Sequence, residues 1–296
     1  MSTVTRRAVV VGVDRSDPAL AAVQYAAAWA GRAKLPLRVL HAFEPSQYAV
    51  HAPVQGTLEV ESVLRKTAQR LLDDTVDVLA AVYPDLDVEA VLEEGSEAEM
   101  LLRESEHAYA VVLGSRGAGG FADLVIGSTT LHVVSHARCP VIAVPASTGD
   151  EDHRTGVVVG VDGSDVSTAA IGFAFEIAAG TGQPLRAVHV WHDVTRTGVG
   201  LMMPVTYDLE QVVEDERLVL AESLVGWREK FPEVDVKALV VPGHPVSVLS
   251  AAAADAQLVV VGSRGRGSIR SLVLGSVSHG VLHHASAPVA VVRDRQ

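Results

Sequence analysis

The strongest constraint on the fold is an internal repeat. The segment VVVGVDRSD begins at Val9 and VVVGVDGSD begins at Val157, so eight of nine residues recur at an offset of 148. The same offset relates LPLRVLHAF (35–43) to QPLRAVHVW (183–191), and VVLGSRGAGG (111–120) to VVVGSRGRGS (259–268). Because 148 is half of the 296 residues, the two halves align without net insertion. A repeat of this length indicates two copies of one domain, not an array of short units.

The junction between the two copies is expected in PASTGDEDHRTG, residues 145–156. This segment is polar and acidic and has no hydrophobic periodicity, which is typical of a linker. We therefore expect one domain over residues 1–147 and a second over residues 155–296, joined by a linker at about 148–154. Both domains then have an ordinary size.

Within each half, short apolar runs alternate with helical periodicity. In the first half we expect strands at 8–13, 37–43, 86–93, 110–114 and 141–145, and helices from 17 to about 32 and at 57–82, 97–106 and 128–136. Ser16 and Pro18 supply an N-cap and a first-turn proline for the first helix. This alternation predicts an α/β fold with right-handed crossovers. The prediction is two tandem doubly wound, Rossmann-like domains, each a five-stranded mostly parallel sheet with helices on both faces.

Composition excludes several classes of protein. The net charge of −12 argues against a general nucleic-acid or anionic-membrane binder. No apolar run reaches about 18 residues, so we expect no membrane span. The lone cysteine, Cys139, permits no disulfide within the chain, which fits a cytoplasmic protein. An acidic protein can still hold an anionic ligand in a local nest of backbone N–H groups.

Three loops in each half follow strand ends and are expected to meet in one crevice, because ligands bind at the carboxyl ends of strands in open α/β sheets. The first loop carries Asp14, or Asp162 in the second half. The second follows His41, or His189, for which a packing or backbone hydrogen-bonding role is the leading interpretation and acid–base work the alternative. The third is the glycine-rich segment at 111–130 and its repeat.

The glycine spacing of the third loop is retained in both halves. Gly114, Gly117 and Gly127-Ser128 recur as Gly262, Gly265 and Gly275-Ser276. Glycines let backbone N–H groups turn toward a ligand, and a helix that begins at Ser128 offers unpaired N–H groups to an anion. This pattern favours a phosphate site, and a purely structural turn is the alternative. Neither a Walker A motif nor G-x-G-x-x-G is present in register.

The combination V-G-V-D-x-S and G-x2-G-x9-G-[ST], present twice, resembles the universal stress protein family. More closely it resembles the ATP-binding, tandem two-domain form found in mycobacteria and related bacteria, and the resemblance covers essentially the whole chain. It implies that ATP is bound once per domain, with Mg²⁺, as a ligand and not as a catalytic cofactor. The site residues implied in the first domain are Gly12, Val13, Asp14, Ala42, Gly114, Ser115, Arg116, Gly117, Ala118, Gly119, Gly120, Gly127, Ser128 and Thr129. Those implied in the second are Gly160, Val161, Asp162, Val190, Gly262, Ser263, Arg264, Gly265, Arg266, Gly267, Ser268, Gly275, Ser276 and Val277.

The resemblance also assigns roles within the site. It places Asp14 and Asp162 on the nucleoside side, the backbone of Ala42 and Val190 against adenine, and the glycine loops around ribose and phosphates. It implies pairing of the two domains through Val141–Val144 and Val289–Val292. A homodimer of the tandem chain is a further expectation. Because Arg266 replaces Ala118, we expect the two sites to bind with unequal affinities.

The function implied is a regulatory or sensor module in stress response and growth control. The alternatives are a slow ATPase or phosphotransfer enzyme, or a binder of AMP or a cyclic nucleotide. Phosphoryl transfer needs a positioned base and charge clamp near the γ-phosphate. Asp14 and Asp162, the carboxylates that recur at a strand end, are placed nearer the nucleoside by the resemblance, so we expect no enzyme.

Other candidate residues are assigned structural roles. His132/His136 and His279/His283/His284 have helical spacing but no recurring third ligand, so no protein metal site is expected. Cys139 aligns with Ala287 and is expected in the core, not as a catalytic thiol. The segment 191–207, which contains Met202-Met203, is either an ordinary loop or an exposed lid or partner surface.

Overall fold

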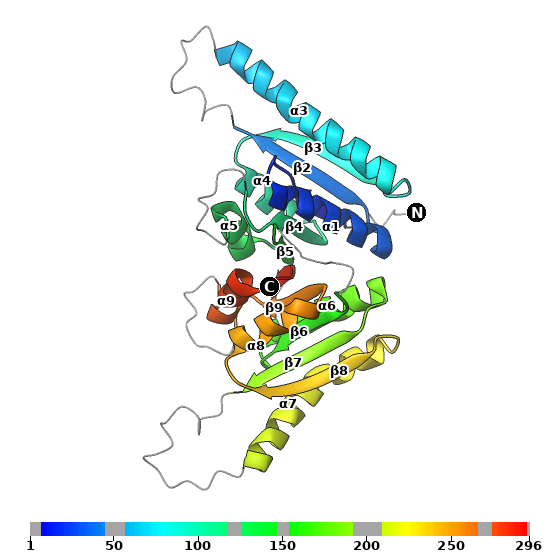
Figure 1. The fold of residues 1–296 in the computed structure, drawn as a ribbon, viewed down its shortest axis with the longest axis vertical. Helices are drawn as coiled ribbons and strands as arrows, with labels where there is room; N and C mark the ends of the chain where they lie inside the picture. Colours follow the sequence, from blue (N-terminus) through cyan, green and yellow to red (C-terminus); the bar gives the residue numbers. More distant parts are fainter. Residues whose placement is uncertain are drawn as a thin grey trace. The chain divides into compact units, whose positions relative to one another are not determined.

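A computed structural model describes residues 7–44, 57–117, 126–146, 154–191, 209–265 and 274–294 (Figure 1). The chain divides into two units, Met1–Ser147 (unit 1) and Thr148–Gln296 (unit 2). Each unit contains the same alternation of strands and helices, as the repeat predicts.

Unit 1 is a five-stranded parallel sheet with strand order β3-β2-β1-β4-β5. Its elements are β1 (Val9–Gly12), α1 (Asp17–Ala33), β2 (Leu37–Phe43), α3 (Thr57–Val82), β3 (Val88–Glu94), α4 (Glu97–Glu104), β4 (Ala110–Gly114), α5 (Ser128–His136) and β5 (Val141–Val144). The strand order reverses direction between β1 and β4, and a crevice is expected at such a switch point.

Unit 2 repeats this topology with strand order β8-β7-β6-β9-β10, again parallel throughout. Its elements are β6 (Val157–Val161), α6 (Asp165–Thr181), β7 (Leu185–Trp191), α7 (Leu209–Lys230), β8 (Val236–Pro242), α8 (Pro245–Ala252), the 3₁₀ turn η3 (Ala253–Asp255), β9 (Leu258–Gly262), α9 (Ser276–His284) and β10 (Val289–Val292). The predicted fold class is confirmed.

The core of each unit follows from its valine-rich strands. In unit 1, β1 and β4 are buried at every residue, whereas β3 has several exposed residues. Strands buried on both faces read as continuous apolar runs, which is the pattern of a sheet covered by helices on either side. Right-handed crossovers put α1 and α3 on one face and α4 and α5 on the other. The packing of α4 on α5, and of α8 on α9, agrees with this arrangement.

The first helix of each unit is capped as predicted. The Ser16 hydroxyl accepts a hydrogen bond from the Ala19 N–H at 3.3 Å, and the Ser164 hydroxyl accepts one from the Ser167 N–H at 3.2 Å. At the other end, Lys34 closes α1 in the left-handed region (φ 52°). Its equivalent in α6 is Gly182 (φ 66°), a residue for which this conformation costs less.

Most predicted boundaries agree with the structure, and the small differences have local causes. The helix expected at 97–106 ends at Glu104. The Ser105 hydroxyl donates to the Leu102 carbonyl at 2.6 Å and accepts from the Arg138 N–H at 3.0 Å, which ties the end of α4 to the turn between α5 and β5. No helix in the described part of the chain is both long enough and apolar enough to cross a membrane.

Candidate functional site

The loops after the three adjacent central strands of each sheet meet at its carboxyl edge. In unit 2 they surround a cavity of about 680 Å³. The described residues that line it are Gly160, Val161, Asp162, Ser167, Val188, Val190, Pro245, Leu249, Val261, Gly262, Arg264, Gly265, Gly275, Ser276, Val277 and Ser278. All described residues expected in the second site, apart from Ser263, are therefore brought together. Six expected residues, Ala118, Gly119, Gly120, Arg266, Gly267 and Ser268, lie outside the described part of the chain.

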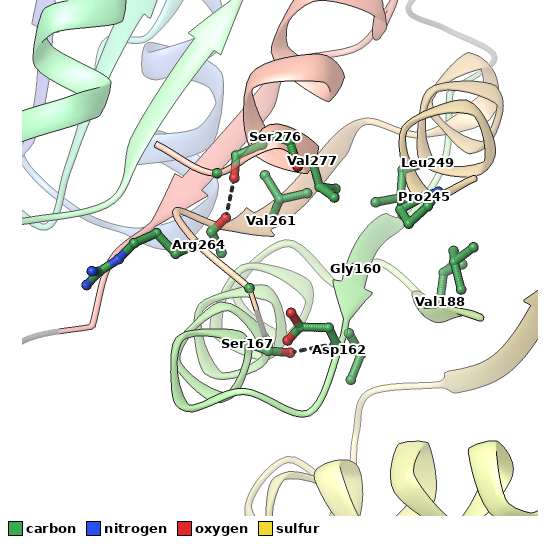
Figure 2. A pocket seen from close by; sticks show the side chains of 16 residues that line it. Gly160, Asp162, Ser167, Val188, Pro245, Leu249, Val261, Arg264, Ser276 and Val277 are labelled. Atoms are coloured by element: carbon green, nitrogen blue, oxygen red, sulfur yellow. Dashed lines mark hydrogen bonds between the residues drawn. The ribbon is translucent and has the colours of Figure 1, made fainter. Parts of the chain in front are cut away.

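The unit-2 cavity has an apolar end and a polar end. Figure 2 shows Val188, Pro245 and Leu249 together on one side, with Ser276 and the Arg264 loop farther along. The Arg264 guanidinium extends away from Asp162 in this view, so the loop offers its main chain to the cavity. An apolar slot with a few convergent polar groups is the usual composition of a small-molecule site.

The recurring aspartate is fixed in the same way in both units. Asp162 Oδ1 accepts hydrogen bonds from the Ser164 N–H at 3.0 Å and from the Ser164 hydroxyl at 2.7 Å. Asp14 Oδ1 accepts from the Ser16 N–H at 2.8 Å and from the Ser16 hydroxyl. One oxygen of each carboxylate thus anchors the helix cap. The other, Oδ2, faces the glycine loop: a Cβ placed on Gly117 would lie 3.0 Å from Asp14 Oδ2.

The recurring histidines hold the strand-end loops in place. His41 Nδ1 and His189 Nδ1 each lie 2.7 Å from a backbone carbonyl oxygen, that of Val13 and that of Val161 respectively. The backbone hydrogen-bonding role expected for these residues is confirmed. Burial lowers the pKa of His41, mainly through lost hydration.

The two histidines differ in their second nitrogen. His189 Nε2 lies 2.7 Å from Glu216 Oε2, which joins β7 to α7. The residue that aligns with Glu216 in unit 1 is Ala68. The two units therefore differ in one polar contact. Glu216 makes it with His189 in unit 2, and the alanine at the aligned position cannot make it in unit 1.

The loop after β4 is closed by three hydrogen bonds. The Ser115 N–H donates to the Val144 carbonyl at 2.6 Å, and the Gly127 N–H donates to the Ser115 carbonyl at 2.7 Å. The Thr130 hydroxyl donates to the Gly114 carbonyl at 2.8 Å. Together they hold the start of α5 against the end of β4.

Unit 2 repeats the three bonds at nearly the same lengths. The Ser263 N–H donates to the Val292 carbonyl and the Gly275 N–H donates to the Ser263 carbonyl, both at 2.7 Å. The Ser278 hydroxyl donates to the Gly262 carbonyl at 2.7 Å. The retained glycine spacing thus corresponds to a retained loop geometry.

The glycines of this loop have two different physical roles. A Cβ on Gly114 would lie 2.6 Å from the Pro18 carbonyl carbon, and a Cβ on Gly275 would lie 3.2 Å from Arg264 Cα. These positions need glycine because another part of the chain packs directly against them. A Cβ on Gly265 would instead meet Asp162 Oδ2. Gly117 and Gly265 are therefore the pair whose missing Cβ lets the loop lie against the aspartate carboxylate.

The helices that begin at Ser128 and Ser276 present a positive end to the loop. Their N-caps, Gly127 and Gly275, make no side-chain capping hydrogen bond, and neither helix has an acidic residue in its first turn. The first N–H groups and the helix dipole are consequently available to an anion.

Glu97 was not among the residues expected in the site. A Cβ placed on Gly12 would lie 3.3 Å from Glu97 Oε1, at the end of β1. Burial, with a smaller contribution from the charge of Asp14, raises the pKa of Glu97 to about 7. The signal available in the sequence was the 148-residue offset, which aligns Glu97 with Pro245.

The other candidates are the paired histidines of α5 and α9 and the single cysteine, and none of them lines the unit-2 cavity. The rings of His132 and His136 have centroids 4.5 Å apart, as do those of His279 and His283. Among the described residues, no group of three or more His, Cys, Asp and Glu side chains is arranged to hold a metal ion. Burial, and then the neighbouring histidines, lower the pKa of His283. Cys139 is buried, as expected for a core residue.

The fold and the repeated strand-end loops define a tandem protein of two doubly wound α/β domains. The sequence profile of the universal stress protein family matches residues 5–145 and again residues 154–293. A universal stress protein of Mycolicibacterium smegmatis is 35% identical over 303 residues, covering 100% of both chains. One from Mycobacterium tuberculosis strain H37Rv is 36% identical over 301 residues and covers 96% of both. The chain belongs to the universal stress protein family.

A solved structure has the same architecture. The crystal structure of a universal stress protein from Archaeoglobus fulgidus superposes with a TM-score of 0.69 at 19% identity, covering 98% of each chain. At this identity the likeness concerns the fold alone.

Proposed function

We propose that each unit binds one molecule of ATP at the carboxyl edge of its sheet, and that the chain acts as a cytoplasmic regulatory module of stress response and growth control. The observation that carries this proposal is the unit-2 cavity. Its volume of about 680 Å³ falls within the range of about 300–1,000 Å³ common for small-molecule sites. Its apolar end suits a base and its polar end suits phosphates.

Individual groups fit the parts of the nucleotide. The uncapped start of α9 at Ser276 would receive the phosphates, and the main chain from Gly262 to Gly265 would wrap them. Asp162 would face the ribose, because its Oδ1 is already held by Ser164 and its Oδ2 faces the cavity. The backbone of Val190 would lie against adenine.

The described lining also bears on Mg²⁺ and on hydrolysis. It contains one carboxylate, Asp162, so Mg²⁺ would be held mainly by the phosphates and by water, as is common for this ion. Figure 2 shows Asp162 and Ser276 on opposite sides of the cavity. A lone carboxylate that lies across the cavity from the start of α9 supplies no charge clamp for phosphoryl transfer there, which favours binding over catalysis.

The test is to identify the nucleotide that the purified protein carries. We expect mass spectrometry of the denatured protein to detect released ATP, and the ATP to survive hours of incubation of the native protein with Mg²⁺. Release of AMP or a cyclic nucleotide would identify a different ligand. Turnover faster than roughly a few per minute, approaching the range of ordinary enzymes, would favour the ATPase alternative.

A further inference from the structure

Among the described lining positions, the two crevices differ in charge at one place. In unit 2 this place is held by Pro245, which lies beside Leu249 at the apolar end of the cavity (Figure 2). In unit 1 the aligned residue is Glu97. Its Oε1 lies 3.3 Å, and Leu101 Cδ1 3.5 Å, from the Cβ position of Gly12. In unit 2, Leu249 Cδ1 lies 3.0 Å from the Cβ position of Gly160. The walls therefore have the same construction, with a carboxyl in place of a proline ring.

The surroundings of Glu97 disfavour its negative charge. The carboxyl is largely withdrawn from water, and Asp14 lies close enough to act on it by charge repulsion. A nucleotide that filled the apolar end would remove the remaining water and bring its own negative charge. Both effects make the ionised carboxyl less compatible with a bound nucleotide.

The other charged groups near this wall do not compensate. The elements packed against α4 are β1, β2 and α5. Their titratable or charged groups are Asp14 and Arg15 after β1, Arg38 and His41 on β2, and the exposed His132 and His136 on α5. Arg38 is already paired with Glu89 and Glu104. His41 is bonded to the Val13 carbonyl and has a lowered pKa, so it is neutral near pH 7.

We propose that Glu97 makes nucleotide binding at unit 1 depend on a proton, whereas binding at unit 2 does not. When Glu97 is neutral, the nucleobase packs against its carboxyl group, which can also donate a hydrogen bond. When Glu97 is ionised, its carboxylate weakens nucleotide binding. Among the described lining residues, Glu97 is thus the one whose charge distinguishes the two sites. The inference rests on the proposed function, because it concerns the same crevice.

The test is calorimetric titration of the full chain with ATP across about pH 6 to 8.5. We expect two sites, one of which weakens by up to about tenfold per pH unit above pH 7, as expected when a single proton is linked to binding. In Glu97→Gln, which is neutral at every pH, that weakening should disappear. Glu99→Gln is the matched control, because Glu99 lies on the same helix but is exposed, and it should retain the pH dependence. Pro245→Glu should give the second site the same behaviour.

A measurement on the unmodified chain guards against a variant that fails to fold. Titration in two buffers of different ionisation enthalpy should detect proton uptake on ATP binding near pH 7. Absence of this uptake, or an unchanged pH profile in folded Glu97→Gln, overturns the role of Glu97 and leaves ATP binding intact. A chain that binds no ATP at any pH overturns the proposed function itself.

Discussion

The recurring glycines of the loop after β4 have different structural roles, although their spacing is the same in both units. Gly114 allows α1 to approach β4, since a Cβ there would collide with the backbone at Pro18 and Ala19. Gly127 allows the loop to close on the start of α5, near Arg116 Cα. Both needs are structural, and both positions are glycine in each half. Only the middle glycine of each set opens toward the aspartate.

Gly117→Ala and Gly265→Ala test that distinction. Neither glycine has a positive φ, so alanine is compatible with the backbone, and the added methyl group projects toward Asp14 or Asp162. We expect the double variant to fold and to bind ATP at least about tenfold more weakly, a loss of about 1.4 kcal/mol. The measurement is calorimetric titration, with Gly31→Ala as control because a Cβ at Gly31 has no neighbour within 4 Å. Full affinity in the double variant would mean that the loop is purely structural.

The raised pKa of Glu97 also predicts how the stability of the nucleotide-free protein depends on pH. Because its pKa rises from 4.5 to about 7 on folding, the folded state binds the extra proton. The resulting penalty is absent below about pH 4.5, grows as the pH rises, and is complete above about pH 7. Glu97→Gln should therefore raise the free energy of unfolding of unit 1 at about pH 8 by about 2 kcal/mol, after allowance for partial exposure. Denaturant unfolding at about pH 5 and about pH 8 checks this; an equal gain at both would indicate a packing effect.

At the scale of elements, the packing of the helices differs between the units even where the strands do not. In unit 2, Phe175 of α6 stacks near Trp227 of α7 and near Phe231, which directly follows α7, with ring centroids 6.2 Å and 5.8 Å away. The Lys230 ammonium lies 5.1 Å from the ring centroids of both Trp227 and Phe231. The residue aligned with Phe175 in unit 1 is Ala27. The long second helix of unit 2 is thus held by an aromatic cluster that unit 1 does not repeat.

Two glycines on these helices provide a matched test of that packing. A Cβ on Gly172 of α6 would collide with the Trp227 ring, whereas a Cβ on Gly226 of α7 has no neighbour within 4 Å. Both substitutions to alanine gain similar helix propensity, up to about 1 kcal/mol. We expect Gly226→Ala to stabilise unit 2 and Gly172→Ala to destabilise it by about 1–3 kcal/mol. Thermal unfolding of both variants decides the matter, and equal stabilisation would show that the α6–α7 contact adapts without cost.

At the scale of the whole molecule, duplication has produced two sheets whose carboxyl edges share one framework and differ in chemistry. The aspartate anchor, the histidine-to-carbonyl bond and the three loop-closing hydrogen bonds recur in both units. The residue beside the first strand end differs, since it is Glu97 in unit 1 and Pro245 in unit 2. The contact between Glu216 and His189 occurs in unit 2 and has no equivalent at Ala68. With one nucleotide bound per unit, as we propose, the tandem arrangement would permit one chain to carry two sites that respond differently to the same ligand.

We propose further that the units pair through β5 and β10, as the family resemblance implies, and that the tandem chain forms a homodimer. An unpaired edge strand exposes N–H groups to solvent, and pairing protects them. Hydrogen exchange should then be as slow in β5 as in the interior strand β1, and much slower than in the edge strand β3. Exchange in β5 as fast as in β3 would rule out the pairing, and sedimentation measures the oligomer separately.

The sequence by itself determined the duplication, the parallel five-stranded sheets and the edge at which the loops meet. It did so because strand and helix periodicity and the position of the strand ends are local properties, and β2, α3, β4 and α5 have the expected bounds. The tertiary structure alone decided which glycines pack against the backbone and which against the aspartate, that Glu97 lies near Gly12 and Asp14, and that Glu216 reaches His189. Those features depend on contacts between residues 11 to 103 positions apart, and no local pattern encodes which atoms a fold brings within van der Waals distance.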